Sequence, residues 1–184
     1  NPFGYNTIIH GHNMTNGSMF GKLKNYTTLG SQAFFDTHRR VYFDTLYGTY
    51  RFEVFSVYIT NKEDPDYRRH GNFGPGEYVE YLNRLRDRGM FKDESAVFTE
   101  NDRILTLSTC NSDEGSSKRT IVHARLVWPK PGSDQTVTPK PEVTVTDTPD
   151  TAVRRVVNLN DPSVPLKLRS KPSTSSEIKG TLPH

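Results

Sequence analysis

The chain has 184 residues, a formal net charge of +3, and a composition that is 33% hydrophobic and 11% aromatic. That aromatic content suffices for a β-rich core and excludes a chain that is disordered throughout. The basic residues form no continuous stripe, and we interpret the clusters at 68–70 and 86–88 as solvated faces, so nucleic acid is not an expected partner. No stretch reaches the roughly 20 apolar residues of a membrane span.

The chain contains one cysteine, Cys110. A single cysteine excludes an intramolecular disulfide and a cysteine-based zinc site, and no metal or cofactor is expected. The sequence opens at Asn1 close to a strand pattern and stops at His184 without a finished element. We therefore interpret it as a piece of a longer protein.

The first predicted strand covers residues 6–12 and is short, with the apolar residues Ile8 and Ile9 at its centre. It breaks at Gly11 and releases His12 and Asn13 into a turn. A polar group at the end of a strand is well placed to meet a ligand, because loops on a rigid scaffold present functional side chains.

Short helical segments and strands follow this turn. The predicted segments are short helical stretches at 19–26 and 31–37 and strands at 39–46 and 48–60. Ser18 is the expected cap of the first helix, and Phe34 and Phe35 of the second are expected to face inward. The two strands are rich in Tyr, Phe and Val and are joined by a turn around Gly48, so both belong in a sheet.

The clearest helix is predicted for residues 75–88. Pro75 suits its first turn, glutamates lie near its N-terminus and arginines near its C-terminus, which complements the helix dipole. Its apolar stripe consists of Tyr78, Leu82 and Leu85, and a glycine ends it.

Residues 103–110 alternate in the period-two pattern of a half-buried strand that ends at Cys110. A second strand at 120–127 follows a short polar loop, so the two are expected to pair as an antiparallel hairpin. The end of one strand and the start of its antiparallel neighbour are adjacent in space. Cys110 and Arg119 are therefore predicted to be neighbours.

The composition changes after residue 128, where prolines are interleaved with Thr, Val and Asp. Such a stretch predicts a semi-extended linker. Beyond it, short strand patterns around a Pro-Ser-Thr-Ser-Ser turn predict the first part of a small β module. The predicted units are a first domain at 1–128, a linker at 129–151 and a partial module at 152–184.

A lone cysteine is most often a small buried hydrophobic residue, and the strand by itself favours that reading. An acyl-transfer site on cysteine needs a thiolate, a proton donor for the leaving amine and a donor for the oxyanion. Cys110, a histidine and Arg119 could supply these three roles, with the arginine favouring the thiolate and unable to act as a base. Among the six histidines, His12 is the best placed, because it lies at a strand end in a Gly-His-Asn turn.

The sequence resembles the sortases, the cysteine transpeptidases of Gram-positive bacterial surfaces, in three runs: GHNMTNGSMFGKLKNY, TLSTC and RTIVHARLV. The histidine follows a glycine, the Thr-Leu-x-Thr-Cys signature ends in the nucleophile, and an arginine opens the next strand. The form of the histidine loop and the helix at 75–88 resemble class B in particular. The resemblance covers residues 6–127.

This resemblance implies a mostly β (α+β) fold, a sortase-type closed β-barrel that here lacks its N-terminal helices and first strands. Because an open barrel loses core area, we expect the isolated chain to be unstable or inactive. The implied catalytic residues are Cys110 as nucleophile, His12 as general acid and base, and Arg119 as oxyanion donor. The substrate-binding residues expected beside them are Asn13, Ser108 and Thr109. The tyrosine-like family position before the glycine is His10 here.

The family cleaves a C-terminal sorting motif after threonine and transfers the acyl group to an amine of a peptidoglycan precursor or a pilin. The resemblance thus implies a sorting peptide and a cell-wall amine as partners, no cofactor, and a location on the extracellular face of the membrane or in the cell wall, through an anchor segment not present in this chain. Residues 152–184 resemble the start of a bacterial SH3-like domain, which implies peptidoglycan binding. A cysteine hydrolase with the same residues and a non-enzymatic wall-binding protein remain alternatives.

Overall fold

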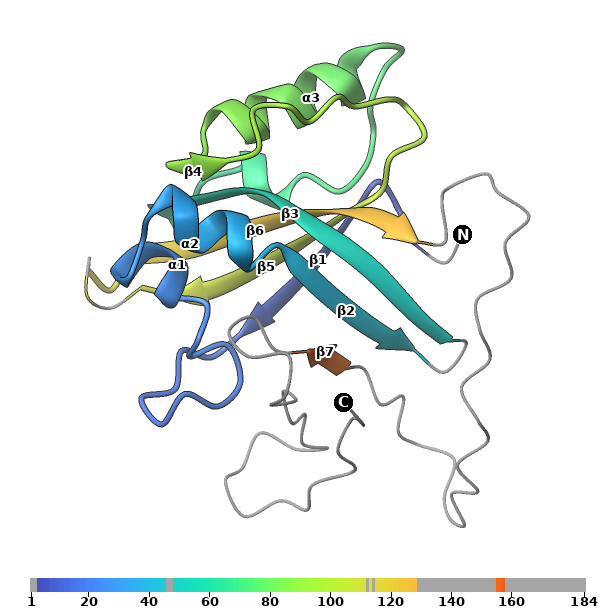
Figure 1. Cartoon of the computed structure of the whole chain (residues 1–184). Helices are drawn as coiled ribbons and strands as arrows, with labels where there is room; N and C mark the ends of the chain where they lie inside the picture. The colour runs from blue at the N-terminus through green and yellow to red at the C-terminus, as the bar shows by residue number, and fades with distance from the viewer. Residues whose placement is uncertain (1–2, 46–47, 112, 114, 129–154, 158–184) are drawn as a thin grey trace, which may run out of the picture.

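The computed structural model describes residues 3–45, 48–111, 113, 115–128 and 155–157. These residues form one curled seven-stranded sheet with a few short helices packed against it (Figure 1). The prediction of a mostly β chain with short helices is confirmed. Among the described residues, no helix has the length and apolarity to cross a membrane.

The strands are β1 (Asn6–Gly11), β2 (Arg40–Thr45), β3 (Gly48–Asn61), β4 (Phe91–Lys92), β5 (Ile104–Cys110), β6 (Lys118–Trp128) and β7 (Arg155–Val157). Their order across the sheet is β1-β5-β6-β3-β2-β7, with β4 paired to β3. Only the β1–β5 pair is parallel in the described part of the chain. Both predicted hairpins, β2–β3 and β5–β6, are confirmed as antiparallel pairs.

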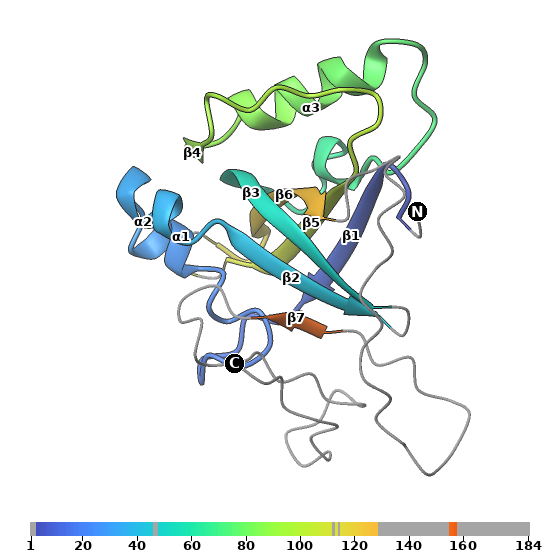
Figure 2. The same cartoon turned by 45° about the vertical axis from the view of Figure 1, so that its right-hand side comes forward.

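The described strands form an open path rather than a closed barrel, because the outer strands β1 and β7 are not paired with each other. β7 lies alongside β2 at one end of the sheet (Figure 2). The predicted linker and nearly all of the predicted SH3-like module lie outside the described residues, so their boundaries stay predictions.

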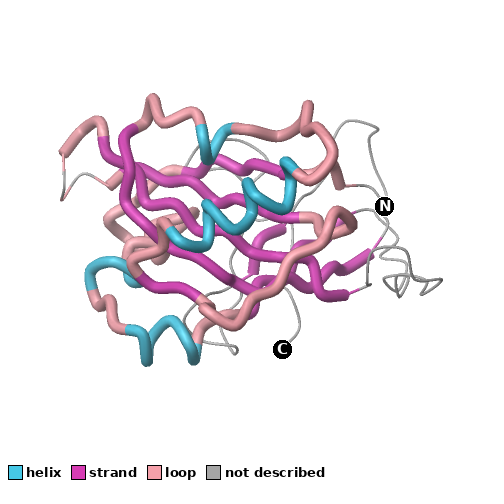
Figure 3. The backbone as a smooth tube through the Cα atoms, turned by 90° about the horizontal axis from the view of Figure 1, so that it is seen from above, coloured by secondary structure: helices cyan, strands magenta, loops and turns pink. Residues whose placement is uncertain are grey.

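Both faces of the sheet are covered. On one face, Leu105 and Leu107 of β5 pack in a large core with residues of the segment that contains α1 (Asn25–Thr28) and α2 (Gln32–Thr37). On the other face, Ile104 packs with α3 (Glu77–Asp87), which lies across the strands in Figure 3. As a result, β5 is buried from residue 104 to residue 109 on both faces, and the prediction of a half-buried strand was wrong.

The helices begin slightly later than the sequence indicated. Ser18 caps no helix; its hydroxyl donates to Asn16 Oδ1 at 2.7 Å, and α1 starts only at residue 25. Gly76, at φ = 78°, precedes α3, so Pro75 lies before the helix rather than in its first turn. The predicted apolar stripe of α3 is confirmed as buried.

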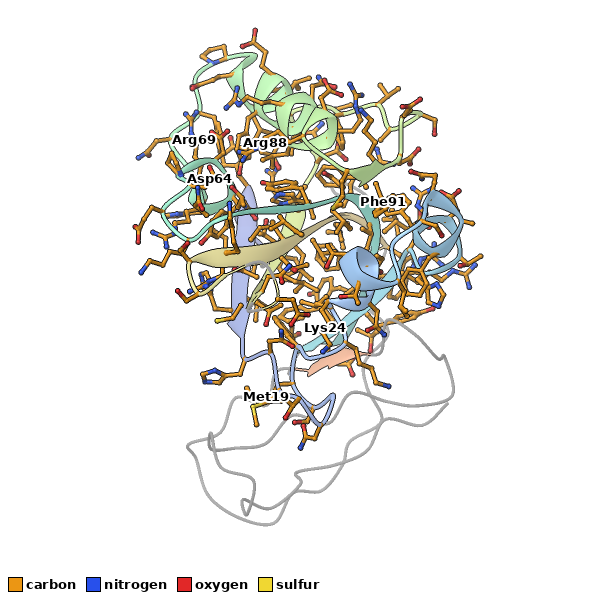
Figure 4. All side chains as sticks on the ribbon, turned by 90° about the vertical axis from the view of Figure 1, so that its left-hand side faces the viewer. Met19, Lys24, Asp64, Arg69, Arg88 and Phe91 are labelled. Carbon is orange, nitrogen blue, oxygen red and sulfur yellow. The ribbon has the colours of Figure 1, made fainter. Side chains whose placement is uncertain are left out.

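Arginines of both clusters form ion pairs. Their interpretation as solvated faces was therefore incomplete. Arg88 pairs with Asp64 and, at 2.9 Å, with Asp66. Arg69 pairs with Glu77 at 2.7 Å. Figure 4 shows Arg69, Arg88 and Asp64 gathered near the short 3-10 helix η1 (Asp66–Arg68), far from Met19. These ion pairs hold η1 against α3 and against the end of β3. They therefore fix the elements that cover one face of β5.

Candidate active site

Three strand ends meet at one edge of the molecule. The last pair of the parallel β1–β5 ladder is Gly11 with Thr109, so His12 and Cys110 directly follow paired residues. In the antiparallel β5–β6 ladder, Cys110 lies opposite Arg119. Directly opposed residues of an antiparallel pair have Cβ atoms about 4.5–5.5 Å apart. The prediction that cysteine and arginine are neighbours is confirmed, and the fold brings His12 to the same end of the ladder.

The end of β5 at Cys110 is more exposed to solvent than the rest of the strand. Cys110 is exposed, whereas the six residues before it are buried. His12 is also exposed, and Arg119 is half-buried with its Nη1 donating to the Lys118 carbonyl at 3.0 Å. The thiol therefore stands where a rigid strand reaches solvent, next to a permanent positive charge.

The loop that carries His12 is tied directly to the cysteine strand. Asn13 Nδ2 donates to the carbonyl of Cys110 at 2.9 Å. The backbone N–H of Phe20 donates to the carbonyl of His12 at 3.0 Å, and Asn13 forms an isolated bridge with Met19. In this structure the Asn13 amide, predicted to bind substrate, braces the histidine loop against Cys110.

The glycine before His12 has a packing role. A Cβ atom at position 11 would lie 2.5 Å from the ring of Phe20, which is itself buried in the core. No real Cβ contact is that short, so a larger residue would push the loop off the core. This contact explains physically why the histidine must follow a glycine here.

The other two predicted substrate-binding residues face opposite sides of β5, because successive side chains on a strand alternate. The Thr109 hydroxyl donates to the carbonyl of Gly11 at 2.8 Å on the face away from Cys110, so it locks the β1–β5 register. Ser108 lies on the cysteine side and is 1% exposed. Its Oγ has no hydrogen-bond partner among the residues that the structure describes.

His10 lies on the same face as Cys110, opposite Ser108 in the β1–β5 register. Partial burial, then the positive charges of Arg68 and Arg119, lower the pKa of its imidazole below the usual value. The sequence reasoning missed Arg68, because no local pattern shows that η1 folds back over β1.

His123, by contrast, belongs to a buried hydrogen-bond chain. Its Nδ1 lies 2.8 Å from Thr106 Oγ1, and its Nε2 lies 2.9 Å from the Tyr58 hydroxyl. Thr106 donates to Asn6 Oδ1, so it can only accept from His123 Nδ1–H, and Tyr58 must donate to Nε2. Complete burial lowers the pKa of His123 to about 3. His123 is therefore a packed structural histidine.

Within the described ranges, no three His, Cys, Asp or Glu side chains lie close enough together to hold a metal ion. The arrangement of a thiol, an imidazole and a guanidinium at one strand edge is instead suited to acyl transfer, in which a thiolate attacks and a cation stabilises the oxyanion.

Comparison with known proteins gives a family. Residues 2–127 match the sortase domain family. The sortase B of Staphylococcus aureus is 33% identical over 124 residues, which cover 67% of this chain and 49% of that protein. The chain thus spans about half the length of the curated relatives it matches.

Solved structures agree. A Bacillus anthracis protein described as similar to sortase B is 39% identical with a TM-score of 0.57, covering 67% of this chain and 53% of that one. A substrate complex of Staphylococcus aureus sortase B is 32% identical with a TM-score of 0.58, covering 67% and 56% of the two chains. A sortase B complex with triglycine is 31% identical with a TM-score of 0.57, covering 67% and 56%. This chain belongs to the sortase family, and the relatives that it matches are sortase B proteins.

Proposed function

We propose that this chain carries the catalytic residues of a cell-wall sorting transpeptidase. The observation that carries the proposal is the register of β5 and β6, which sets Cys110 opposite Arg119, with His12 at the adjoining end of β1. Family membership supports the reaction class. The substrate complex of the staphylococcal relative and the triglycine complex of a sortase B support a peptide donor and an amine acceptor.

The first half of the proposed reaction is acylation. The Cys110 thiolate attacks the carbonyl carbon of a threonine in a C-terminal sorting motif, and Arg119 donates hydrogen bonds to the oxyanion that forms. The C–N bond then breaks, and His12 in its protonated form gives the leaving amine a proton. A thioester on Cys110 and a neutral His12 remain.

The second half releases the product. Neutral His12 takes a proton from an incoming amine, which attacks the thioester carbonyl and forms a new amide bond. The C–S bond breaks and the thiolate returns, so atoms and charges balance over the cycle. We propose an amine of a peptidoglycan precursor or a pilin as the acceptor, and the extracellular face of the membrane or the cell wall of a Gram-positive bacterium as the location.

The test uses the fact that Cys110 is the chain's only cysteine. The full chain is incubated with a panel of peptides that each contain a threonine-bearing sorting motif, and intact-mass spectrometry follows adducts on the protein. The expected result is a thioester adduct that triglycine converts into a peptide–triglycine product, with none on a Cys110→Ala variant.

Other outcomes point to the alternative functions. An adduct that disappears at the same rate with and without triglycine, yielding only free acid, would indicate a cysteine hydrolase. If no peptide of the panel acylated Cys110, the transpeptidase proposal would be wrong, and the non-enzymatic wall-binding protein would be favoured. Pull-down of residues 129–184 on purified peptidoglycan tests the predicted SH3-like module separately.

A further inference from the structure

Asn6 is a buried polar residue at the start of β1 that the proposed reaction does not use. Its side chain is 4% exposed and is hydrogen-bonded at both ends of the carboxamide. The Nδ2 group donates to the carbonyl of Arg69 at 2.9 Å, and it also reaches the carbonyl of Tyr67 at 3.4 Å and the Tyr81 hydroxyl at 3.3 Å. The Oδ1 atom accepts from Thr106 Oγ1 at 2.7 Å. Because carbonyl oxygens only accept, these partners fix which end of the amide is the nitrogen.

A second buried side chain holds the same segment from α3. Tyr81 is completely buried, and its hydroxyl donates to the carbonyl of Asp66 at 2.8 Å, with the carbonyl of Arg69 at 3.1 Å. The last carbonyls of a helical turn have no partner within the turn itself, so side chains that donate to them fasten the turn in place. Asn6 from β1 and Tyr81 from α3 thus hold the end of η1 between them.

Held in this way, η1 packs onto strands on both sides of β5. Tyr67 of η1 is completely buried and forms a small cluster with Tyr58 and Ile121. Its ring centroid lies 6.4 Å from that of His10 on β1. Because β5 lies between β1 and β6 in the sheet, η1 spans one face of β5.

The cover that η1 provides ends beside the proposed nucleophile. Ser108 and Ile121 are opposed in the β5–β6 register, and both are buried. The next pair on this face is Cys110 with Arg119, and the Cys110 thiol is exposed. The boundary between covered and open strand therefore falls between residues 108 and 110. A peptide whose carbonyl group lies at the Cys110 thiol lies beside this boundary, so the height of η1 above β5 limits the space for the peptide.

We propose that Asn6 is a positioning residue that, together with Tyr81, fixes the height of η1 above β5 and so sets how tightly the peptide binds beside Cys110. We call these two side chains the η1 clamp. The inference rests on the proposed function and assigns residues that control its substrate binding. The β1–β5 and β5–β6 ladders hold Cys110, His12 and Arg119 independently of the clamp. Loss of the clamp should therefore weaken peptide binding and leave the chemical step intact.

The experiment measures acylation of Cys110 in the full chain, with the sorting peptide of the panel that reacts fastest, in excess and without an amine acceptor. Intact-mass spectrometry at increasing peptide concentration gives the maximal rate constant and the half-saturating peptide concentration. Unfolded molecules lower only the amplitude of the reaction, so a loss of stability alone changes neither value. The two values therefore separate a positioning role from a purely structural one.

Two variants loosen η1 from different sides. Asn6→Ala should raise the half-saturating concentration about tenfold and keep the maximal rate constant within about twofold, because η1 loses the donor on β1. Tyr81→Phe keeps the packed ring and removes only the hydroxyl, so it should raise the half-saturating concentration by a smaller factor, about threefold. Because it preserves the core, Tyr81→Phe tests the clamp even if Asn6→Ala does not fold.

Thr106→Val is the matched control. It removes the hydrogen bond to Asn6 Oδ1 within the same buried chain, but it leaves the Nδ2 donors that face η1. It should lower the free energy of unfolding and keep the half-saturating concentration within about twofold of the wild-type value.

Three results would overturn the clamp while leaving the transpeptidase proposal intact. They are an unchanged half-saturating concentration in both Asn6→Ala and Tyr81→Phe, an equal rise in Thr106→Val and Asn6→Ala, and a fall in the maximal rate constant with no rise in the half-saturating concentration. Failure of every peptide to acylate Cys110 in the wild-type chain would instead overturn the proposed function, and the clamp with it.

Discussion

Two residue pairs of the β5–β6 hairpin differ sharply in their exposure to solvent. In one, Thr106 opposes His123, and both are completely buried in a hydrogen-bond chain that leaves no ring nitrogen of the histidine unused. Four residues further along β5, Cys110 opposes Arg119, and the thiol is exposed. The two pairs lie on the same face of the same hairpin.

The difference between these regions lies in what covers them. α3 and η1 lie over the buried pair and make the surroundings of His123 so apolar that its pKa falls to about 3. The cover still buries Ser108 and Ile121, the next pair on this face, and ends before residue 110, so the Cys110–Arg119 pair reaches solvent. A histidine under α3 and η1 thus has a structural role, whereas a histidine outside them is available for chemistry. Burial, rather than sequence context, decides between the two roles.

The largest expected effect tests which histidine belongs to the exposed region. His12→Ala should lower kcat/KM for transpeptidation by about 10²–10⁴-fold, because both proton transfers lose their general acid and base. His10→Ala should cost less than about tenfold, as expected of a residue that takes no part in the proposed proton transfers. Steady-state kinetics with a sorting peptide and triglycine measure both. Full activity in His12→Ala together with loss of activity in His10→Ala would reverse the assignment.

A smaller effect is expected at the arginine of the exposed pair. Arg119→Gln should lower kcat by about 10²-fold, because the oxyanion loses a charged donor. Arg119→Lys should restore part of this loss, since it keeps the charge but not the planar fork of donors. Arg125→Gln, further along β6, is the control. If Arg119→Gln raised KM alone, the residue would bind substrate without stabilising the transition state.

The exposed pair could be predicted from sequence because it depends on local features. The alternating pattern and the short loop after Cys110 are sufficient to predict the hairpin, and the hairpin predicts Arg119 as the neighbour. The position of His12 beside them depends on the parallel β1–β5 pair, which joins residues 98 apart, such as Gly11 and Thr109. No local pattern specifies such a pairing, so only the family resemblance supplied it.

The buried pair shows what the sequence could not provide. The alternation in β5 predicted a half-buried strand, since nothing in that stretch shows that α3 and η1 return to cover its second face. For the same reason Arg88 was interpreted as solvent-facing, although it is partly buried and pairs with Asp64. Tertiary cover is set by contacts distant in sequence.

Breaking the buried pair should affect stability instead of chemistry. His123→Ala removes a packed ring and leaves the buried hydroxyl of Tyr58 without its partner, which should cost about 2–4 kcal/mol of unfolding free energy. Chemical denaturation measures this cost, and kcat per folded molecule should stay the same. His12→Ala, which is exposed, should change stability by less than about 0.5 kcal/mol. Equal costs at the two histidines would contradict the contrast between the regions.

A further expected effect is the pH dependence that His123 gives to stability. Its pKa is about 3 in the folded state, against 6.5 for an unperturbed histidine such as that of the unfolded chain. Between these values the unfolded state binds a proton that the folded state does not, so the contribution is complete above pH 6.5 and is lost as the pH falls toward 3. The slope should approach about 1.4 kcal/mol per pH unit between about pH 6 and pH 4.5.

Other groups must be separated from this slope. The pKa values of Asp64 and Asp93 are also lowered, but from 3.8, so their contributions disappear only at more acidic pH. His10 shifts in the same direction as His123. The comparison therefore uses a His10→Gln background with and without His123→Gln, and urea unfolding at several pH values gives the difference. If the slope over that acidic range were unchanged by His123→Gln, the buried ring would already be protonated, and its assigned acceptance of the Tyr58 hydroxyl would be wrong.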